Sequence, residues 1–319
     1  MTIAILGGTG FIGTAVTGRV LARGLAPLVL ARGQHAVALP EGARFERADR
    51  MDGKRLVEIF QQHEVDTVID IFALGLLNTG AVLQAMGAVG GRYVLLSSVD
   101  VYSNYGGLLK RESPVVQLRP AREDDPLRGF RFPYRGNPHR PQGVEAPLFE
   151  DYDKIILEEA SAADGRFETT VIRAPMIFGP GDKQHRFGWA IKAVQQGGVI
   201  EIDQRAAKWP NSYGYVDDVA EAMVLAATSP KAAGRTYNVG QSFVRTPIEW
   251  LLSFAVVLNR SVEVVEVPAE KRALQAERAD ATDLHYPLTL DTSRIRAELG
   301  FSEIVPEREA LLRTIAAEA

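Results

Sequence analysis

The chain has 319 residues, no cysteine and a formal net charge of −4. This length suits one large domain, or a core domain with a smaller one. The acidic balance gives no electrostatic reason to expect nucleic acid or an anionic membrane as a partner. The absence of cysteine excludes disulfides, thiolate zinc sites and cysteine nucleophiles. The amino terminus has no basic region before its apolar run, and no apolar run approaches the ~18 residues of a membrane span, so we expect a cytoplasmic protein.

Short apolar runs alternate with helix-like stretches from residue 1 to about residue 100. Continuous apolar strands that alternate with helices are typical of a parallel sheet buried on both faces. Right-handed crossovers would then give an α/β fold with a doubly wound parallel (Rossmann) sheet. The expected strands are residues 2–7, 26–33, 44–50, 65–74 and 92–102, and the expected helices are residues 11–24, 55–64 and 80–90.

Residues 103–148 interrupt this alternation, because they show no period and are rich in arginine, proline and glycine. So long a loop in a compact domain is a candidate lid or binding loop, or is locally disordered. The alternation then resumes with a helix at 149–163. Further helices are expected at 187–196 and 219–228, strands at 168–175, 235–240 and 262–268, and mainly helix over the rest of 245–319. We predict a dinucleotide-binding domain of residues 1–180, to which 213–240 return, and a smaller, mainly helical substrate domain of 181–212 and 241–319.

The stretch ILGGTGFIG contains both G-x-x-G-x-x-G, at Gly7, Gly10 and Gly13, and G-x-G-x-x-G, which starts at Gly8. Glycines at these spacings permit a tight turn, a close approach of the backbone to a pyrophosphate, and close packing of helix on strand. The phosphate then lies at the helix amino terminus. Because the motif follows a strand and opens a helix, it indicates a dinucleotide site.

The end of the second expected strand bears on the choice of dinucleotide. An NAD site usually has an acidic residue there for the ribose 2′-hydroxyl, but no Asp or Glu lies between Thr14 and Pro40. Arg32 stands in its place, and a guanidinium can pair with a 2′-phosphate. The sequence therefore favours NADP, with NAD as the alternative if Arg32 is only a solvated loop cation.

Seven stretches give the chain an almost end-to-end resemblance to the extended short-chain dehydrogenase/reductase family, in its epimerase/dehydratase branch. They are GGTGFIG, ADRMD, VLLSSVDVY, VIRAPMIFGPGD, YVDDVAEAM, YNVG and DTSRIRAELGF. The resemblance implies that Asp49 contacts adenine, with Arg50 beside it. With the glycine turn and Arg32 included, the full set of expected cofactor-binding residues is Gly7, Thr9, Gly10, Phe11, Ile12, Gly13, Arg32, Asp49, Arg50, Phe72, Ala73, Lys154, Pro175 and Ile177.

In that family a Ser or Thr hydroxyl, a Tyr phenol and a Lys ammonium act together on the proton that accompanies hydride transfer. The resemblance places Ser98 at the hydroxyl position and Lys154 at the lysine position. The tyrosine position, four residues before the lysine, holds Glu150. On a continuous helix Tyr152 would point roughly 200° away from Lys154.

Three alternatives remain open for the missing phenol. Glu150 could act as a base, or it could merely form a surface ion pair with Lys154 at the favoured i, i+4 spacing. The helix could instead begin late, which would let Tyr152 turn towards the site. Asp100 could serve as the acid, because on a strand it shares a face with Ser98.

The substrate is less well marked. Nucleotide-sugar members of the family carry an arginine before the YVxVxD stretch, and Asn211 stands there, which counts against a nucleotide-sugar substrate. The resemblance implies substrate contacts from Tyr102, His185, Arg186 and Trp209. The arginine-rich loop could close over an anionic or aromatic substrate, or be solvated.

These observations lead to one principal hypothesis. The chain is expected to be an NADP(H)-dependent reductase, epimerase or dehydratase of a small-molecule carbonyl or alcohol. The alternative is a non-catalytic NADP-binding redox sensor or scaffold. The histidines show no metal-ligand spacing, and a homodimer is one expectation.

Overall fold

The computed structural model describes residues 1–33, 39–137 and 144–318, and its core is a seven-stranded sheet in which all pairings are parallel. The spatial order is β10-β6-β5-β4-β1-β2-β3, so the chain winds outwards from β1 in both directions. This confirms the predicted doubly wound α/β fold. The strands are β1 (Thr2–Leu6), β2 (Ala26–Ala31), β3 (Arg44–Arg47), β4 (Val65–Asp70), β5 (Arg92–Ser98), β6 (Glu168–Ala174) and β10 (Thr236–Asn238).

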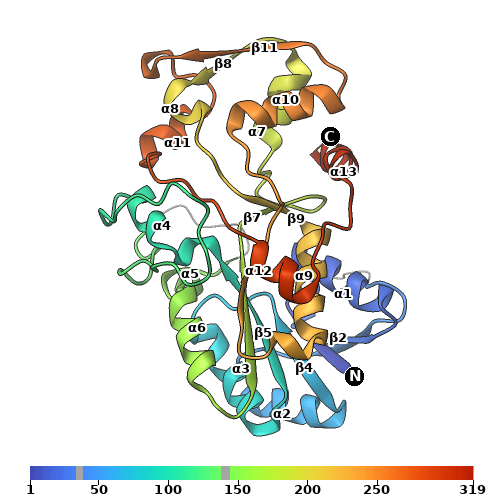
Figure 1. Cartoon of the computed structure of the whole chain (residues 1–319). Coiled ribbons are helices and arrows are strands. Elements are labelled where there is room, and N and C mark those ends of the chain that lie inside the picture. The colour runs from blue at the N-terminus through green and yellow to red at the C-terminus, as the bar shows by residue number, and fades with distance from the viewer. Residues whose placement is uncertain (34–38, 138–143, 319) are drawn as a thin grey trace.

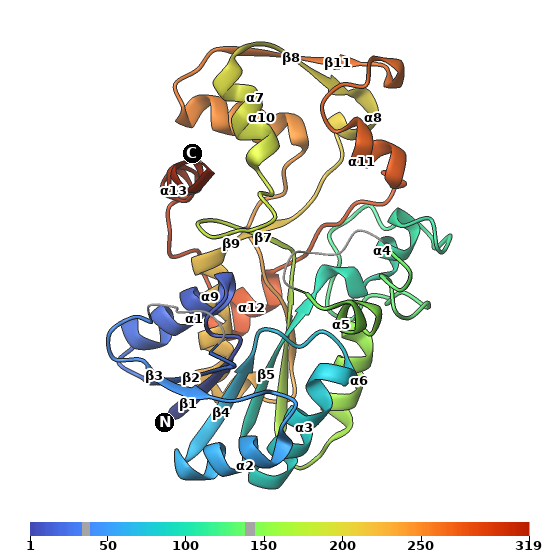
Figure 2. The same ribbon diagram turned by 180° about the vertical axis from the view of Figure 1, so that it is seen from behind.

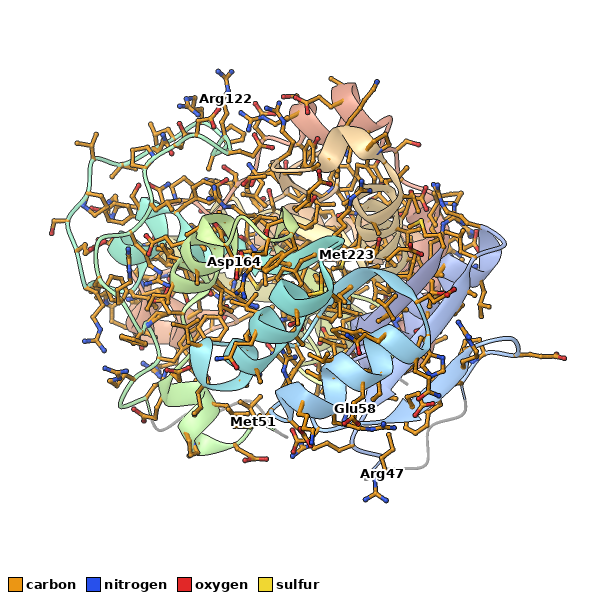
Figure 3. The ribbon with its side chains drawn as sticks, turned by 90° about the horizontal axis from the view of Figure 1, so that it is seen from below. Arg47, Met51, Glu58, Arg122, Asp164 and Met223 are labelled. Atoms are coloured by element: carbon orange, nitrogen blue, oxygen red, sulfur yellow. The ribbon has the colours of Figure 1, made fainter. Side chains whose placement is uncertain are left out.

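Helices cover both faces of the sheet (Figures 1 and 2). Successive side chains of a strand point to opposite faces. Accordingly, Ile3 and Ile5 pack in one apolar cluster, and Ala4 and Leu6 pack in the other. Helices α1 (Phe11–Ala22) and α9 (Val216–Thr228) cover the first face, and helices α2 (Gly53–Gln62), α3 (Leu76–Val89) and α6 (Lys154–Ala163) cover the second. Figure 3 looks onto this layered body from below, with Met223 of α9 in its interior.

A second region lies beyond the carboxyl edge of the sheet, in the upper half of Figure 1. Its centre is an aromatic cluster in which Trp250 contacts Phe187, Phe178 and Tyr213. Two small parallel ladders, β7 with β9 and β8 with β11, complete it. Its elements are β7 (Met176–Phe178), α7 (Gly188–Gln196), β8 (Gly198–Asp203), α8 (Gln204–Ala207), β9 (Tyr213–Tyr215), α10 (Pro247–Val257), β11 (Val262–Val267), η3 (Ala269–Lys271), α11 (Ala276–Ala281) and α13 (Glu307–Glu318). The short η2 (Pro230–Ala232) and α12 (Ser293–Leu299) lie against the main body.

The segment expected as one long loop is partly ordered. It holds helices α4 (Ser103–Leu108) and α5 (Ala146–Glu150), and residues between them pack on the core. Leu127 pairs with Tyr102 as an isolated antiparallel bridge. Arg122, by contrast, projects outwards at the rim (Figure 3). That this loop is a lid stays a prediction, and residues 138–143 of it lie outside the described part.

Two expected elements have different ends in the structure. The strand expected at 92–102 stops at Ser98, and a 3-10 turn, η1 (Val99–Val101), follows it. The helix expected at 149–163 is broken into α5 and α6, because Asp153 is extended and caps α6 by accepting hydrogen bonds from the amides of Ile155 and Ile156. Among the described residues, no helix combines the length and apolar character that a membrane crossing requires.

Candidate active site

The glycine turn joins the carboxyl end of β1 to the first turn of α1 and is too tight for side chains. Gly7 has φ +85°, and a Cβ on Gly13 would lie 2.1 Å from the Gly7 carbonyl oxygen. Gly10 is the N-cap of α1 and offers no side chain to its free amides. Phe72 lies directly against the turn, with its Cβ 3.2 Å from the place of a Gly7 Cβ. A bare helix amino terminus behind such a turn fits a pyrophosphate, so these residues suit a dinucleotide.

Arg50, which was expected beside Asp49 at the adenine, is held by an ion pair within the protein. Its guanidinium donates to both carboxylate oxygens of buried Asp70, at 2.9 and 2.6 Å, and to the carbonyl of Asn78. Burial opposes the charge, but Asp70 outweighs it and raises the pKa of Arg50. The guanidinium therefore makes its hydrogen bonds to other groups of the protein, whereas the side chain of the neighbouring Asp49 is exposed.

Arg32 lies exposed at the carboxyl end of β2. Its Nη1 is 3.2 Å from the Glu145 carboxylate, a pair in which both side chains are about half or more exposed. Arg47 of β3 flanks the same turn, since its Cδ is 3.8 Å from the place of a Gly33 Cβ. A solvated ion pair of this kind is weak, so it does not commit the Arg32 guanidinium to Glu145.

Ser98 ends β5, and its hydroxyl accepts a hydrogen bond from the Asp100 amide at 3.2 Å. Because Asp100 lies in the η1 turn, the expectation that it shares a strand face with Ser98 is wrong. The turn nevertheless buries Asp100, which is only 3% exposed. Its Oδ1 has no hydrogen-bond partner among the described residues.

Tyr152 is turned into the site. The break between α5 and α6 leaves residue 152 outside either helix, so the 200° separation of a continuous helix does not apply. The phenol donates to Asp100 Oδ2 at 2.7 Å, and the Lys154 Nζ lies 5.7 Å from the ring centre. The Ser98 hydroxyl lies near enough to act on the phenol, whose pKa it lowers against the stronger effect of burial. The structure therefore brings Ser98, Asp100, Tyr152 and Lys154 together.

Lys154 is buried at the first residue of α6. Its ammonium donates to the carbonyls of Ala73 and, at 2.8 Å, Leu96. Burial lowers the pKa of Lys154 to about 8, although Asp100 and Asp70 act to raise it. It therefore remains mostly charged at neutral pH, as a binder of hydroxyl or carbonyl oxygens must be.

Glu150 is not brought into this group. It ends α5, and its carboxylate accepts hydrogen bonds from the Gly136 amide at 3.2 Å. Among the described residues no ion pair joins Glu150 to Lys154, whose ammonium donates instead to the carbonyls of Ala73 and Leu96. The Glu150 carboxylate therefore binds the long loop at Gly136. The side chain that lies beside Asp100 and Lys154 is Tyr152.

Two tyrosines that were not among the expected site residues also lie at the site. Tyr134, from the long loop, lies 3.4 Å from Asp100 Oδ2 through its hydroxyl, and that hydroxyl is 2.7 Å from the hydroxyl of Tyr105 in α4. The Tyr134 ring contacts the Tyr152 ring at 4.9 Å and stacks on Phe149 at 5.0 Å. The only signal was an aromatic residue among the loop arginines, with nothing to place it in space.

The residues expected at the substrate are scattered. Tyr102 is buried, and its hydroxyl donates to Asn238 at 2.6 Å and accepts from Arg173. Trp209 is buried and donates to the Tyr286 carbonyl. His185 is exposed and pairs with Glu318 of α13. The fourth residue, Arg186, is held by Asp182 at 2.7 Å. The hydrogen bond and the ring contact of Tyr152 described above go to Asp100 and Tyr134, not to any of these four.

The remaining expected cofactor residues lie around the same edge of the sheet. Ala73 is buried and its carbonyl holds Lys154. Pro175 and Ile177 are buried in the strand-and-turn after β6. Thr9 and the half-buried Phe11 and Ile12 belong to the glycine turn and the start of α1.

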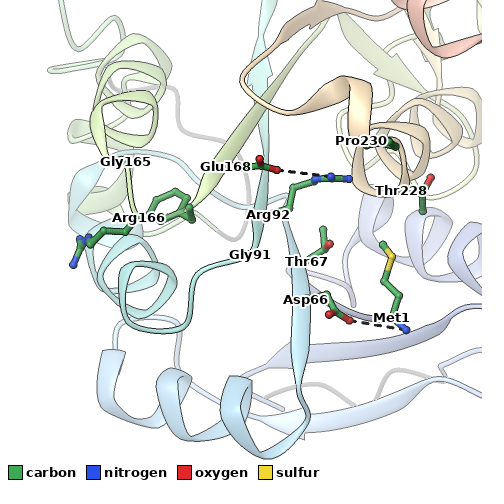
Figure 4. Close-up of a pocket in the computed structure, with 11 residues that line it drawn as sticks. Met1, Asp66, Thr67, Gly91, Arg92, Gly165, Arg166, Glu168, Thr228 and Pro230 are labelled. Carbon is green, nitrogen blue, oxygen red and sulfur yellow. Dashed lines mark ion pairs between the residues drawn. The ribbon is translucent and has the colours of Figure 1, made fainter.

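A shallow cavity of about 680 Å³ lies at the opposite, amino-terminal edge of the sheet (Figure 4). Four of its charged groups form two ion pairs. Arg92 lies 3.8 Å from Glu168, and the terminal amine of Met1 lies 3.9 Å from Asp66. The chemistry-bearing groups are all at the other edge, where parallel sheets bind their ligands.

Comparison with known proteins agrees with this arrangement. The model of the NAD-dependent epimerase/dehydratase family matches residues 3–122 and 153–240. The chain is 24% identical over 293 residues to 2′-dehydrokanamycin reductase of Streptomyces kanamyceticus, covering 88% of this chain and 73% of the relative. It is 27% identical over 286 residues to dTDP-6-deoxy-L-talose 4-dehydrogenase (NAD(P)(+)) of Kitasatospora kifunensis, covering 84% and 82%.

A solved structure of similar fold is the UDP-glucose 4-epimerase of Thermus thermophilus in complex with NAD. It superimposes with a TM-score of 0.66 at 22% identity, covering 100% of this chain and 99% of that one. The family match spans more than half of the chain and confirms the resemblance that the sequence motifs indicated. The chain therefore belongs to the NAD-dependent epimerase/dehydratase family, a family of NAD(P)-dependent enzymes.

Proposed function

We propose that the protein is an NADP(H)-dependent oxidoreductase that interconverts a carbonyl and a hydroxyl on a small, sugar-like molecule without a nucleoside diphosphate. The observation that carries the proposal is the position of Tyr152. Its phenol lies 2.7 Å from Asp100, and its ring lies 5.7 Å from the Lys154 ammonium. The family's hydroxyl, phenol and ammonium are thus all present, although the phenol comes from an unexpected position in the chain.

The nicotinamide, when bound, would supply or accept the hydride. The glycine turn and the α1 amino terminus would hold its pyrophosphate. Arg32 would pair with the 2′-phosphate, because the carboxyl end of β2 has no acidic residue for an NAD ribose. The buried Lys154 would hold the neighbouring ribose by its ammonium hydrogens.

The chain's own groups would handle the proton. The Tyr152 hydroxyl would give a proton to the substrate oxygen during reduction and take it back during oxidation. The Ser98 hydroxyl would hold that oxygen in place by a hydrogen bond. The rate advantage expected from such a positioned acid/base is about a hundredfold to ten-thousandfold.

Two observations support the substrate class. Asn211 is buried and uncharged where nucleotide-sugar members carry an arginine, so no cation stands there for a diphosphate. The relatives named above act on carbohydrates by name, one on a dehydrokanamycin and one on a dTDP-deoxysugar. The first of these substrates carries no nucleotide in its name, and the second supports only the sugar part of the proposed class.

The test has two steps. Calorimetry should show binding of NADPH tighter than NADH, and failure to bind either cofactor would sink the proposal. Steady-state oxidation of NADPH should then be measured with a panel of keto-sugars, each with and without a nucleoside diphosphate. Turnover of the free keto-sugars is expected, and turnover of the nucleotide forms alone would refute the substrate class.

A further inference from the structure

Three tyrosines from three different parts of the chain gather around Asp100. Tyr152 precedes α6, Tyr134 comes from the long loop, and Tyr105 comes from α4. The Tyr152 and Tyr134 hydroxyls both approach the same oxygen, Oδ2, at 2.7 and 3.4 Å. Tyr105 extends the row through its 2.7 Å contact with Tyr134.

The Asp100 carboxyl is buried, yet none of the ion pairs among residues 1–33, 39–137 and 144–318 includes it. Arg128 acts on the carboxyl only through its charge, because it donates to the Asp100 main-chain carbonyl at 2.9 Å and to Phe130 and Asp153. The second carboxyl oxygen, Oδ1, is buried without a partner among the described residues. A buried carboxyl with one free oxygen is well suited to accept a proton, because protonation removes the cost of the buried charge.

Burial and the neighbouring groups shift the pKa values of Asp100 and Tyr152 in opposite directions. Burial raises the pKa of Asp100, while Arg128, Tyr152, Lys154 and Ser98 act to lower it. Burial and then Asp100 raise the pKa of Tyr152 well above its usual value, opposed by the Ser98 hydroxyl. A phenolate beside an ionised Asp100 would place two negative charges within hydrogen-bond distance in a buried site, which is strongly unfavourable.

We propose that Asp100 and Tyr152 act as one acid/base unit with a single transferable proton, held in position by Tyr134 of the long loop. This inference rests on the proposed function. The family's usual scheme relies on a lysine to favour the phenolate. Here the carboxylate disfavours the phenolate, so the phenol relays a proton that Asp100 supplies or receives.

The step balances without a phenolate. During oxidation the substrate O–H bond breaks and its proton joins the Tyr152 oxygen. At the same time the Tyr152 O–H bond breaks and that proton joins Asp100 Oδ2, while the hydride leaves to the nicotinamide named in the proposed function. Reduction runs the same transfers backwards, starting from protonated Asp100 and ending with the Tyr152 hydroxyl donating to the carboxylate. That end state has the hydrogen bond present in the structure.

The first experiment needs no substrate. Tyrosine ionisation is followed by near-ultraviolet absorbance in the wild type, Asp100→Asn and Tyr152→Phe, and the signal of Tyr152 is obtained by difference. We expect Tyr152 to ionise at a lower pH in Asp100→Asn than in the wild type, because the negative neighbour is gone and Lys154 remains. An unchanged Tyr152 titration would overturn the coupling. Asp218→Asn, which removes another buried carboxyl held by the Ile304 and Val305 amides, is the matched control.

The second experiment uses additivity. Asp100→Asn and Tyr152→Phe should each lower kcat by about a hundredfold or more. Because residues that act as a unit are non-additive, the double variant should be no slower than the slower single variant. Losses that multiply in the double variant would refute the unit.

The pH profile separates the roles of Asp100 and Tyr134. The rate of oxidation by the wild type should rise with pH as Asp100, whose pKa is raised, loses its proton. This rising limb of the pH–rate profile should be absent in Asp100→Asn. Tyr134→Phe keeps its ring contacts but removes a donor to the carboxylate, so the limb should move to higher pH, with kcat several-fold lower and KM little changed. Tyr237→Phe, whose hydroxyl bonds Glu298 elsewhere, is the control. If Asp100→Asn keeps the wild-type limb, the inference is wrong.

The outcomes distinguish this inference from the proposed function. A protein that turns over no carbonyl but shows the coupled titration refutes the proposed function and keeps the unit. An active enzyme whose two single losses multiply keeps the function and refutes the unit.

Discussion

The Arg128 guanidinium and the Asp153 carboxylate form a buried ion pair, with Nη2 3.0 Å from Oδ1 and neither side chain exposed. Asp153 also accepts hydrogen bonds from the amides of Ile155 and, at 2.6 Å, Phe132. One carboxylate thus starts α6 and anchors the long loop. Because α6 starts there, the residue before the cap is free of helix geometry, and Tyr152 faces Asp100.

Replacing Arg128 with Met should destabilise the protein by about 3–5 kcal/mol, because the change leaves Asp153 charged and buried without its partner. Urea unfolding measures the loss. Arg131→Met is the matched control from the same loop, since its pair with Glu159 is more exposed and worth ~1 kcal/mol or less. Equal effects of the two substitutions would contradict the anchoring role.

Tyr152→Phe should lower kcat by about a hundredfold or more, whereas Glu150→Gln should change kcat little. The reason is the break between α5 and α6, which points the Glu150 carboxylate at the Gly136 amide and the phenol at Asp100. Steady-state kinetics on both variants decide between them. A large loss of kcat in Glu150→Gln, with Tyr152→Phe active, would restore the hypothesis that the carboxylate replaces the phenol.

Much of the fold and the cofactor cleft could be predicted because the signals are local. The glycine turn, Ser98 and Lys154 each lie in short motifs whose geometry depends on a few neighbouring residues. The direction of the Tyr152 side chain also depends partly on local sequence. Asp153, directly before the helix-like stretch KIILEEA, is an N-cap signal. That signal would have placed the helix start at Lys154 and excluded the continuous helix.

The rest of the site depends on contacts between residues far apart in the chain. Nothing near Tyr134 in the sequence indicates that it would reach Asp100, 34 residues earlier. The ion pair of Arg50 with Asp70, at the end of β4, is a second contact of this kind. Such pairings follow from the packed fold, which residue spacing alone does not determine.

Arg32→Ser should weaken NADPH binding by about tenfold or more and leave NADH binding unchanged. The estimate takes a charge-assisted hydrogen bond as worth about 1.5–3 kcal/mol, with 1.4 kcal/mol per tenfold in Kd. Titration calorimetry with both cofactors measures the ratio. Arg166→Ser, an exposed arginine paired with Asp164 away from the cleft, is the control. An equal loss of affinity for NADPH and NADH would show that Arg32 does not bind the 2′-phosphate.

The buried ammonium of Lys154 predicts an unusual dependence of stability on pH. Burial lowers its pKa from 10.5 to about 8 in the folded protein. Between these two values the unfolded chain binds more protons than the folded one. The free energy of unfolding should therefore rise with pH there, by up to about 1.4 kcal/mol per pH unit and about 3 kcal/mol in all. Below pH 8 this contribution to the slope vanishes.

Urea unfolding of the apo wild type and Lys154→Met across this pH range isolates the effect, since other titrating groups are common to both proteins. The wild type should gain stability relative to the variant as pH rises from about 8. Lys192→Met, at an exposed position of α7, should run parallel to the wild type because its ammonium is hydrated in both states. A constant difference between the wild type and Lys154→Met would mean that Lys154 stays protonated throughout the range. The two carbonyls of Ala73 and Leu96 would then hold the charge more strongly than burial opposes it.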